Sequence, residues 1–555
     1  MVHNFRTSSQ AATTPREGDA LGILHGRIVG HGDDVRDLTA RHVLDAQGAY
    51  LSPAFGDAHN HMLWFGLSLG EIDLSGCVSL TGVYDAVSAR AQGLPSDSWI
   101  VGSGYDHSVL GGHPTREMLD RAGGRPVWLK HRSGHQCAVS SLVLSRAGAL
   151  TGDTVVAPGG GVVRGVDGQP SGILEENAQA LVSQQRGPVD LDEMVDAIAR
   201  ASTVYAGEGL THVVECGIGG GLVGRSPVEA LAYQIAREQG SLDVRVDLMP
   251  TLDVLHPHLV TADGPAGTGL DLGLRTGFGD DRLRLGPVKV WLDGSLIGRS
   301  AAVSEPFCDE SHGLGELADD PDRMLGSLVA AHRAGWRLAM HAIGDRAVDV
   351  ALDVVEAAQR SHRQSDARHR IEHAAVVRPD QLPRMRAAGV VPVPQPRFLH
   401  DIGDTMLAAL GPGRTDWMYR HRSFLEAGLR VPGSSDRPVA DGAPLLGIQS
   451  MVQRTTSSGQ PIGADEAVDG GTALLAYTAD EAWACHDEHR RGGLAPGMLA
   501  DLVLLSDDPA AVPPSQIDQI DVVATLLGGV ATHVSGHLGG DSLDRLREQQ
   551  QEEAS

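Results

Sequence analysis

The chain has 555 residues, a length that indicates several domains or one large barrel with additions. Its 45 Lys and Arg residues against 71 Asp and Glu residues give a formal charge of −26, so we expect a small-molecule substrate and no nucleic-acid partner. No apolar stretch approaches the roughly 20 residues that span a bilayer, and the start MVHNFRTSSQAATTPREGD is too polar for a signal peptide. We therefore expect a cytoplasmic protein that does not bind membranes.

The cysteine and lysine residues indicate which kinds of site the chain can form. The 5 cysteines are widely spaced and include no CxxC pair, so neither a disulfide framework nor a thiolate zinc site is expected. Lys130 and Lys289 are the only lysines, and the other 43 basic residues are Arg. A lysine that persists in such a chain can mark a position that needs a primary amine.

The two ends of the chain show a similar β-rich pattern. Short apolar runs broken by Gly and Asp occur within residues 1–53 and again within 481–540, which is typical of antiparallel strands joined by tight turns. Because chain termini often lie close together, we expect these segments to form one small β-sandwich. Residues 541–555 read as a polar tail.

Between these ends, residues 54–480 alternate short apolar strands with longer amphipathic helices, which predicts an α/β fold with a parallel sheet. Eight such units close into a (β/α)8 barrel. The gap after the first strand is too long for a crossover, so we expect an inserted subdomain at about 78–200, with a hairpin around Asp167-Gly168. The eight strand candidates are 54–61, 211–217, 244–252, 285–294, 337–345, 368–376, 390–398 and 429–439.

The first strand ends in Asp57-Ala58-His59-Asn60-His61. Side chains alternate along a strand, so His59 and His61 share a face at a spacing that lets two imidazoles bind one metal ion. An isolated pair of this kind is more often structural than metal-binding.

Four further residues favour a metal-binding role for this pair. Each falls at the carboxyl end of a later strand, where the active sites of barrel enzymes lie. Each alone is explained as a core histidine or a helix N-cap, but together with the first pair they predict a metal centre. They are Lys289, His341, His373 and Asp436.

An ammonium group among metal ligands is electrostatically unfavourable. A lysine that has added CO2 becomes a carbamate anion whose two oxygens can bridge two cations, and arginine cannot do this. We therefore predict that Lys289 is N-carboxylated.

With these residues in place, the chain resembles the amidohydrolase superfamily, specifically its YtcJ-like branch, which includes N-substituted formamide deformylases. The resemblance implies a metal-dependent hydrolase barrel with a β-sandwich made from both chain ends. It also implies that His59, His61 and Asp436 hold one zinc ion, that His341 and His373 hold a second, and that carboxylated Lys289 bridges them. The matching motifs are LSPAFGDAHNH (51–61), PTREMLDRAGGRPVWLKHRSGH (114–135), SGILEENA (171–178), VKVWLDGSL (288–296), HAIGDRAVDVALDVVE (341–356), RIEHAAVVRPDQLPRM (370–385), SSDRPV (434–439) and GGLAPGMLADLVLL (492–505).

The resemblance extends to residues of the insertion. Glu176 occupies the family's GxLxE position and is a candidate metal ligand or substrate contact, although Glu175 is equally acidic and a glutamate at a helix start is also favoured by the helix dipole. His131 and His135 are candidate substrate contacts, or else a structural pair.

Aromatic residues near the metal strands predict the substrate. Trp64 follows the first strand and Phe398 follows the seventh, in a chain that is only 4% aromatic, so we expect them to bind a largely apolar substrate. Trp291 lies beside Lys289 but out of phase with it, which favours packing.

We therefore predict a metal-dependent enzyme that cleaves the C–N bond of a small, apolar, formamide-like amide, with Asp436 as proton shuttle. A carbamate, ester or lactone hydrolase, or a deaminase, remains an alternative on this scaffold. An inactive scaffold protein would have lost at least one metal ligand, and all are present. The family analogy also predicts a homo-oligomer.

Overall fold

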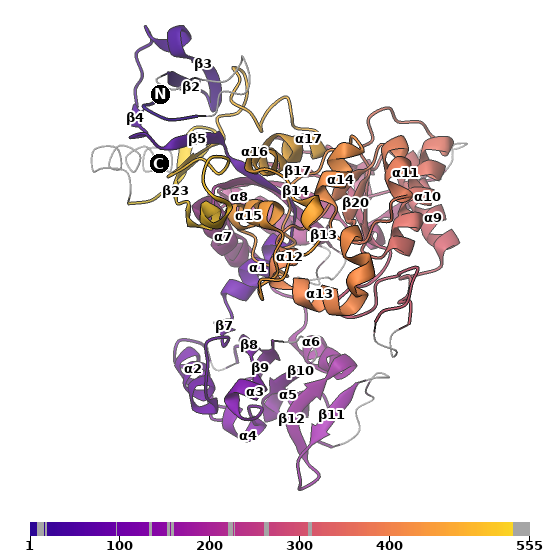
Figure 1. Ribbon diagram of the computed structural model, residues 1–555. Coiled ribbons are helices and arrows are strands. Elements are labelled where there is room, and N and C mark those ends of the chain that lie inside the picture. Colours follow the sequence, from indigo (N-terminus) through magenta and orange to yellow (C-terminus); the bar gives the residue numbers. More distant parts are fainter. Residues whose placement is uncertain are drawn as a thin grey trace. The chain divides into compact units, whose positions relative to one another are not determined.

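The computed structural model describes residues 1–7, 16, 19–95, 97–132, 136–151, 156, 160–219, 226, 228–259, 266–308 and 313–536. The chain divides into two compact units (Figure 1). The first comprises Met1–Phe65, Ile198–Val223 and Pro227–Ser555, and the second comprises Gly66–Ala197 with Gly224–Ser226. Among the described helices, none is long and apolar enough to cross a membrane.

A parallel barrel forms the centre of the first unit, as the sequence predicted. Each expected strand falls on one of its segments, and consecutive strands pair in parallel register within two sheets, β17-β14-β13-β6 and β18-β19-β20-β21. In chain order the strands are β6 (Phe55–Asn60), β13 (Leu210–Ile218), β14 (Arg245–Pro250), β17 (Leu283–Leu285) continued by β18 (Val288–Trp291), β19 (Leu338–Ala342), β20 (Arg370–His373) and β21 (Val391–Val393).

Backbone pairing at two places closes the barrel. The two sheets pair where Thr251 forms a parallel bridge with Lys289. The eighth segment, residues 429–436, returns to β6, because Ala58 N–H donates to the Gly433 carbonyl at 3.0 Å and Asp436 N–H donates to the His59 carbonyl at 2.7 Å. No strand is assigned to this segment, and Asp436 at its end has a positive φ of +57°. Pro432 lacks the N–H that a ladder requires, which explains the difference from the expected strand.

Amphipathic helices alternate with the barrel strands. In α10 (Asp345–Ser361), residues at three- and four-residue spacing from Ala347 to Ala358 are buried, so one face packs on the strands. The start of α9 (Pro321–Arg333) is fixed by Asp320, whose side chain accepts from Arg323 N–H, and by Pro321 in the first turn. Helix α7 (Leu191–Gly207) begins in the second unit and continues into the first. Other helices of the first unit are α8 (Glu229–Glu238), α11 (Gln381–Ala388), α12 (Phe398–Asp401), α13 (Gly403–Leu410), α14 (His421–Glu426), α15 (Pro444–Gln453), α16 (Gly470–Leu475) and α17 (Glu481–Ala484).

Both chain ends contribute to a β-sandwich, and its two sheets enclose a common apolar core that includes Phe5, Leu21 and Leu502. Residues 537–555, with the expected tail, lie outside the described residues. One sheet contains β1 (Val2–His3), β2 (Ala20–Leu24), β3 (Arg27–His31) and β4 (Leu44–Asp45), and the other contains β5 (Tyr50–Pro53), β22 (Leu502–Leu505), β23 (Val522–Leu527) and β24 (Val530–Val534).

The second unit has its own sheet and core. The hairpin expected around Asp167-Gly168 is present, because β11 and β12 pair antiparallel and Gly168 takes the positive φ that such a turn needs. The strands are β7 (Ile72–Asp73), β8 (Ile100–Tyr105), β9 (Val127–His131), β10 (Gln136–Val139), β11 (Gly161–Arg164) and β12 (Pro170–Glu175), and the main helices are α2 (Leu80–Gln92), α3 (His107–Leu110), α4 (Arg116–Leu119), α5 (Ser141–Arg146) and α6 (Ala180–Arg186).

Candidate active site

Six of the residues expected to bind metal converge at the carboxyl ends of the barrel strands. They line one cavity of about 220 Å³. The fold brings them together because parallel strands end at a common rim. His59 and His61 come from the end of β6, Lys289 from β18, His341 from β19, His373 from β20 and Asp436 from the eighth segment.

Asp436 lies between the two histidines of the first strand. Its Oδ1 is 3.0 Å from His61 Nε2 and 3.3 Å from His59 Nε2. Lys289 Nζ lies 3.4 Å from the same His59 nitrogen. Asp436 holds this position with a φ of +57°, a left-handed conformation that non-glycine residues adopt at a cost and that often marks functional sites.

Glu372 fixes the orientation of His59. The His59 Nδ1–H donates to Glu372 Oε2 at 2.5 Å, and Arg370 donates to both oxygens of that carboxylate at 2.7 and 2.9 Å. Burial alone would raise the pKa of Glu372, but the Arg370 guanidinium outweighs it and holds that pKa below its usual range. Arg370 and Glu372 thus support His59 from behind and do not line the cavity themselves.

The positions of these donor atoms provide a test of whether the site suits a metal ion. His59, His373 and Asp436 each offer one ligand atom, and these three atoms all lie within 4.8 Å of one another. Two imidazoles and a carboxylate are a ligand set that zinc accepts. The donor set therefore fits a divalent ion.

The second pair of histidines is oriented in the same manner. The His341 Nε2–H donates to the Gly294 carbonyl at 3.0 Å, which leaves Nδ1 as the ligating atom. The His373 Nδ1–H donates to Gln395 Oε1 at 2.7 Å, which leaves Nε2. Burial lowers the pKa of His341 to about 3 and lowers that of His373 as well, so both rings are neutral, the form that binds metals.

Two supporting residues were not found from the sequence. Gln395 orients His373. Asp57 accepts from Ser435 N–H and Oγ at 3.0 and 2.5 Å and from His59 N–H at 3.1 Å, which ties the eighth segment to β6. Asp57 belongs to the DAHNH motif, so the sequence already placed it beside the ligands. Its partner Ser435 lies 378 residues away, and the sequence did not indicate that contact.

Apolar side chains form the rest of the cavity wall. Trp64 and Phe398, the expected substrate contacts, both line it, and so does Trp291, for which the sequence favoured packing. Trp291 lies with its ring centroid 5.4 Å from Lys289 Nζ. Other apolar lining residues are Leu296, Ile297, Ile343, Ile402, Met406, Tyr419 and Val439.

The remaining candidates belong to the second unit. His131 ends β9 and contacts His107 there. Glu176 starts a short 3-10 turn, but its side chain, like all of His135, lies outside the described residues. Of these three candidates, His131 is therefore the one whose side chain the structure describes.

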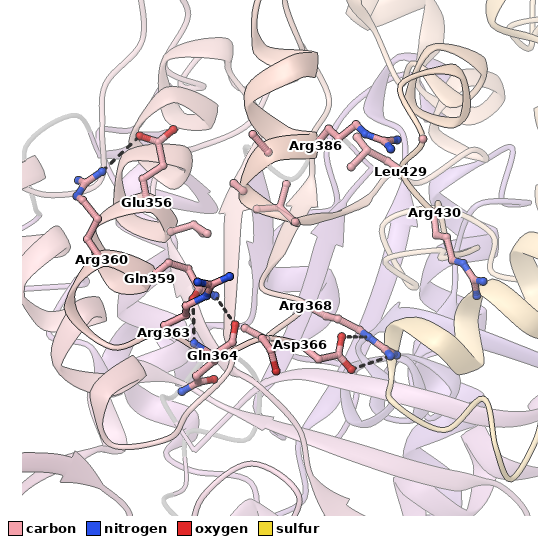
Figure 2. Close-up of a pocket in the computed structure, with 18 of the residues that line it drawn as sticks. Glu356, Gln359, Arg360, Arg363, Gln364, Asp366, Arg368, Arg386, Leu429 and Arg430 are labelled. Carbon is pink, nitrogen blue, oxygen red and sulfur yellow. Dashed lines mark hydrogen bonds and ion pairs between the residues drawn. The ribbon is translucent and has the colours of Figure 1, made fainter.

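A larger cavity of about 910 Å³ lies elsewhere on the first unit (Figure 2). Most of its lining residues precede β20 and β21 or lie at the start of the eighth segment, at the opposite end of these strands. Figure 2 shows several arginines around it, among them Arg363, Arg386 and Arg430. Its lining includes no histidine. The smaller cavity, with its imidazoles, is therefore the candidate active site.

A barrel with four histidines, a lysine and an aspartate at its carboxyl rim defines the class of metal-dependent hydrolases. The chain belongs to the Amidohydrolase family, which matches residues 42–533, and the resemblance drawn from the motifs is thereby confirmed.

Relatives of known name span most of the chain. The putative amidohydrolase YtcJ of Bacillus subtilis is 29% identical, over 88% of this chain and 89% of that protein. The N-substituted formamide deformylase of Arthrobacter pascens is 28% identical, over 92% and 94%. A solved structure, an uncharacterized metal-dependent hydrolase from Pyrococcus furiosus, is 28% identical with a TM-score of 0.74, over 92% and 99%. The protein is accordingly a metal-dependent hydrolase acting on carbon–nitrogen bonds other than peptide bonds.

Proposed function

We propose that the protein hydrolyses a small, neutral, largely apolar N-substituted amide, with an N-aryl or N-arylalkyl formamide as the leading substrate. The observation that carries this proposal is the composition of the cavity wall. Among the described residues that line the cavity, the only charged side chains besides the histidines are Lys289 and Asp436, and both belong to the proposed metal centre. The described part of this wall therefore offers no separate cation to pair with a substrate carboxylate, whereas its aromatic and aliphatic side chains suit an apolar group.

The proposed metal centre contains two divalent ions, zinc being the proposed metal. His59, His61 and Asp436 would hold one ion, and His341 with His373 would hold the other, through the nitrogens that their hydrogen bonds leave available. Lys289, as the carbamate, would bridge them. When bound, such ions polarise a carbonyl oxygen and lower the pKa of water to about 7.

Asp436 carries the proton transfer in this proposal. A carboxylate oxygen between His59 and His61 takes a proton from the attacking water and returns it to the leaving nitrogen. Trp64 and Phe398 hold the apolar substituent so that the amide carbon faces this carboxylate. The amine and the carboxylic acid, formic acid for a formamide, are then released.

The test is a substrate panel with metal-loaded enzyme: N-benzylformamide, N-benzylacetamide, an aryl carbamate and an N-acyl amino acid, each followed by amine release. We expect the formamide to be turned over fastest. Phe398→Ala should raise the KM for N-benzylformamide by about tenfold, the effect of losing an aromatic contact of roughly 1.4 kcal/mol. Phe278→Ala, which changes an exposed phenylalanine away from the cavity, is the matched control.

Strong turnover of the charged N-acyl amino acid, with none of the neutral amides, would contradict the substrate assignment. Turnover of the carbamate alone would favour the alternative of a carbamate hydrolase.

A further inference from the structure

A second cluster of metal-compatible side chains lies in the second unit. Strands β8 and β9 are parallel neighbours, and Tyr105 pairs with His131 at their carboxyl ends. Asp106 and His107 follow β8 directly, while His131 is the last residue of β9. Two adjacent strand ends thus deliver a carboxylate and two imidazoles to one place, the same arrangement that builds the barrel rim.

The donor atoms of these residues converge. His107 Nδ1 lies 2.9 Å from His131 Nε2. One carboxylate oxygen of Asp106 joins them in a set whose members all lie within 4.8 Å of one another. His131 is 8% exposed, so this nitrogen pair lies at the edge of the unit's core.

Neighbouring groups hold the three side chains in place. Asp106 is the N-cap of α3 and accepts from Ser108 N–H at 3.0 Å and from Ser108 Oγ at 2.6 Å, both through Oδ1. Arg132 donates to Oδ2 at 3.0 Å, but its side chain is 66% exposed and can turn away. A third imidazole, His113, stacks on His107 with ring centroids 4.2 Å apart.

We propose that Asp106, His107 and His131 bind one divalent transition-metal ion of the zinc type, with none of the six barrel residues involved. Two imidazoles and a carboxylate are a ligand set that zinc accepts, with water in the fourth position. A tetrahedral zinc ion with bonds of about 2.0–2.1 Å holds two nitrogens about 3.4 Å apart, so the two rings need to separate by only about half an ångström. In this assignment His131 is a metal ligand, whereas the sequence suggested either a substrate contact or a structural residue.

The competing explanation is that His107 and His131 are neutral and simply hydrogen-bonded to each other. Titration with metal distinguishes this explanation from metal binding. Holoenzyme, loaded with zinc and desalted, is titrated with ZnCl2 in a calorimeter. We expect one further site in the wild-type protein. Its affinity should fall at least tenfold in Asp106→Asn and in His107→Ala, and should be unchanged in His256→Ala, which removes an exposed histidine of the first unit.

Asn is as good an N-cap as Asp, so Asp106→Asn keeps the start of α3 while it removes the charge. Equal thermal unfolding of this variant and the wild-type protein in EDTA verifies that the fold is retained. A zinc-soaked crystal should show an anomalous peak bonded to His107 and His131. The proposal is wrong if the wild-type holoenzyme takes up no further zinc, or if both variants bind it as tightly as the wild-type protein does.

Discussion

Glu372 is the residue that decides which nitrogen of His59 faces the cavity. Glu372→Gln keeps the shape but weakens the acceptor that holds the Nδ1–H and removes the partner of the buried Arg370. We expect the affinity of the first metal to fall by about 10- to 100-fold, the usual effect of losing such a support. Competition with a chelator measures it.

Glu466→Gln is the matched control, because Glu466 is also buried and paired with arginine but lies outside the cavity. An unchanged metal affinity in Glu372→Gln would show that Glu372 does not support His59.

Lys289 is the residue whose chemical form matters most. Lys289→Ala should remove most activity, because no bridging anion remains, and short carboxylic acids should restore part of it by occupying the place of the carbamate. Lys289→Arg should stay inactive, since a guanidinium does not add CO2. Full activity in Lys289→Arg would rule out the bridging role. The measurement compares the hydrolysis rates of the wild-type protein and both variants with and without added acetate, together with their metal content.

Asp436 tests the proton transfer. Asp436→Asn keeps the size of the side chain and removes the base, so we expect kcat to fall by about two to four decades. Circular dichroism should show an unchanged fold. A variant with nearly wild-type kcat would exclude Asp436 as the proton shuttle.

At the scale of elements, strand β6, which ends in His59 and Asn60, is tightly packed against α17 at Gly56. A Cβ added to Gly56 in β6 would overlap the carboxylate of Glu481 from α17, which is buried and bonded to His212 and Arg491. Gly56→Ala should therefore lower the free energy of unfolding by about 1–3 kcal/mol, the usual cost of overpacking. Urea denaturation of the metal-loaded protein measures it.

Gly326 gives the opposite expectation. It lies exposed in the middle of α9 with nothing within 4 Å of its missing Cβ. Gly326→Ala should stabilise the protein by about 0.5–1 kcal/mol, because alanine restricts the unfolded chain more. If Gly56→Ala proved as stable as Gly326→Ala, the Glu481 side chain of α17 would be able to move aside at little cost, contrary to this prediction.

At the scale of the whole molecule, the metal centre joins strands that are far apart in the sequence. Metal bound at the rim should stabilise the folded state by about 2.7 kcal/mol when the free ion is at 100 times its Kd. Chelation should therefore lower the Tm in calorimetry, and adding zinc back should restore it. An unchanged Tm, with metal loss verified by elemental analysis, would contradict this linkage.

The sequence alone determined the barrel, the sandwich and the six rim residues. Strand periodicity marks each β-strand, and the rule that parallel strands end at one rim places His59, Lys289 and His373 together without any knowledge of distances. One exception was local: the segment that carries Asp436 is not a regular strand, since Pro432 interrupts the pairing.

Only the tertiary structure decided how those residues are held and what surrounds them. Which nitrogen of His59 is free depends on Glu372, which is 313 residues away along the chain, and the orientation of His373 depends on Gln395. The His107–His131 pair likewise arises from the parallel pairing of β8 with β9. A single sequence records periodicity and residue type, but hydrogen bonds between distant segments follow from packing, so they appear only when the chain is folded.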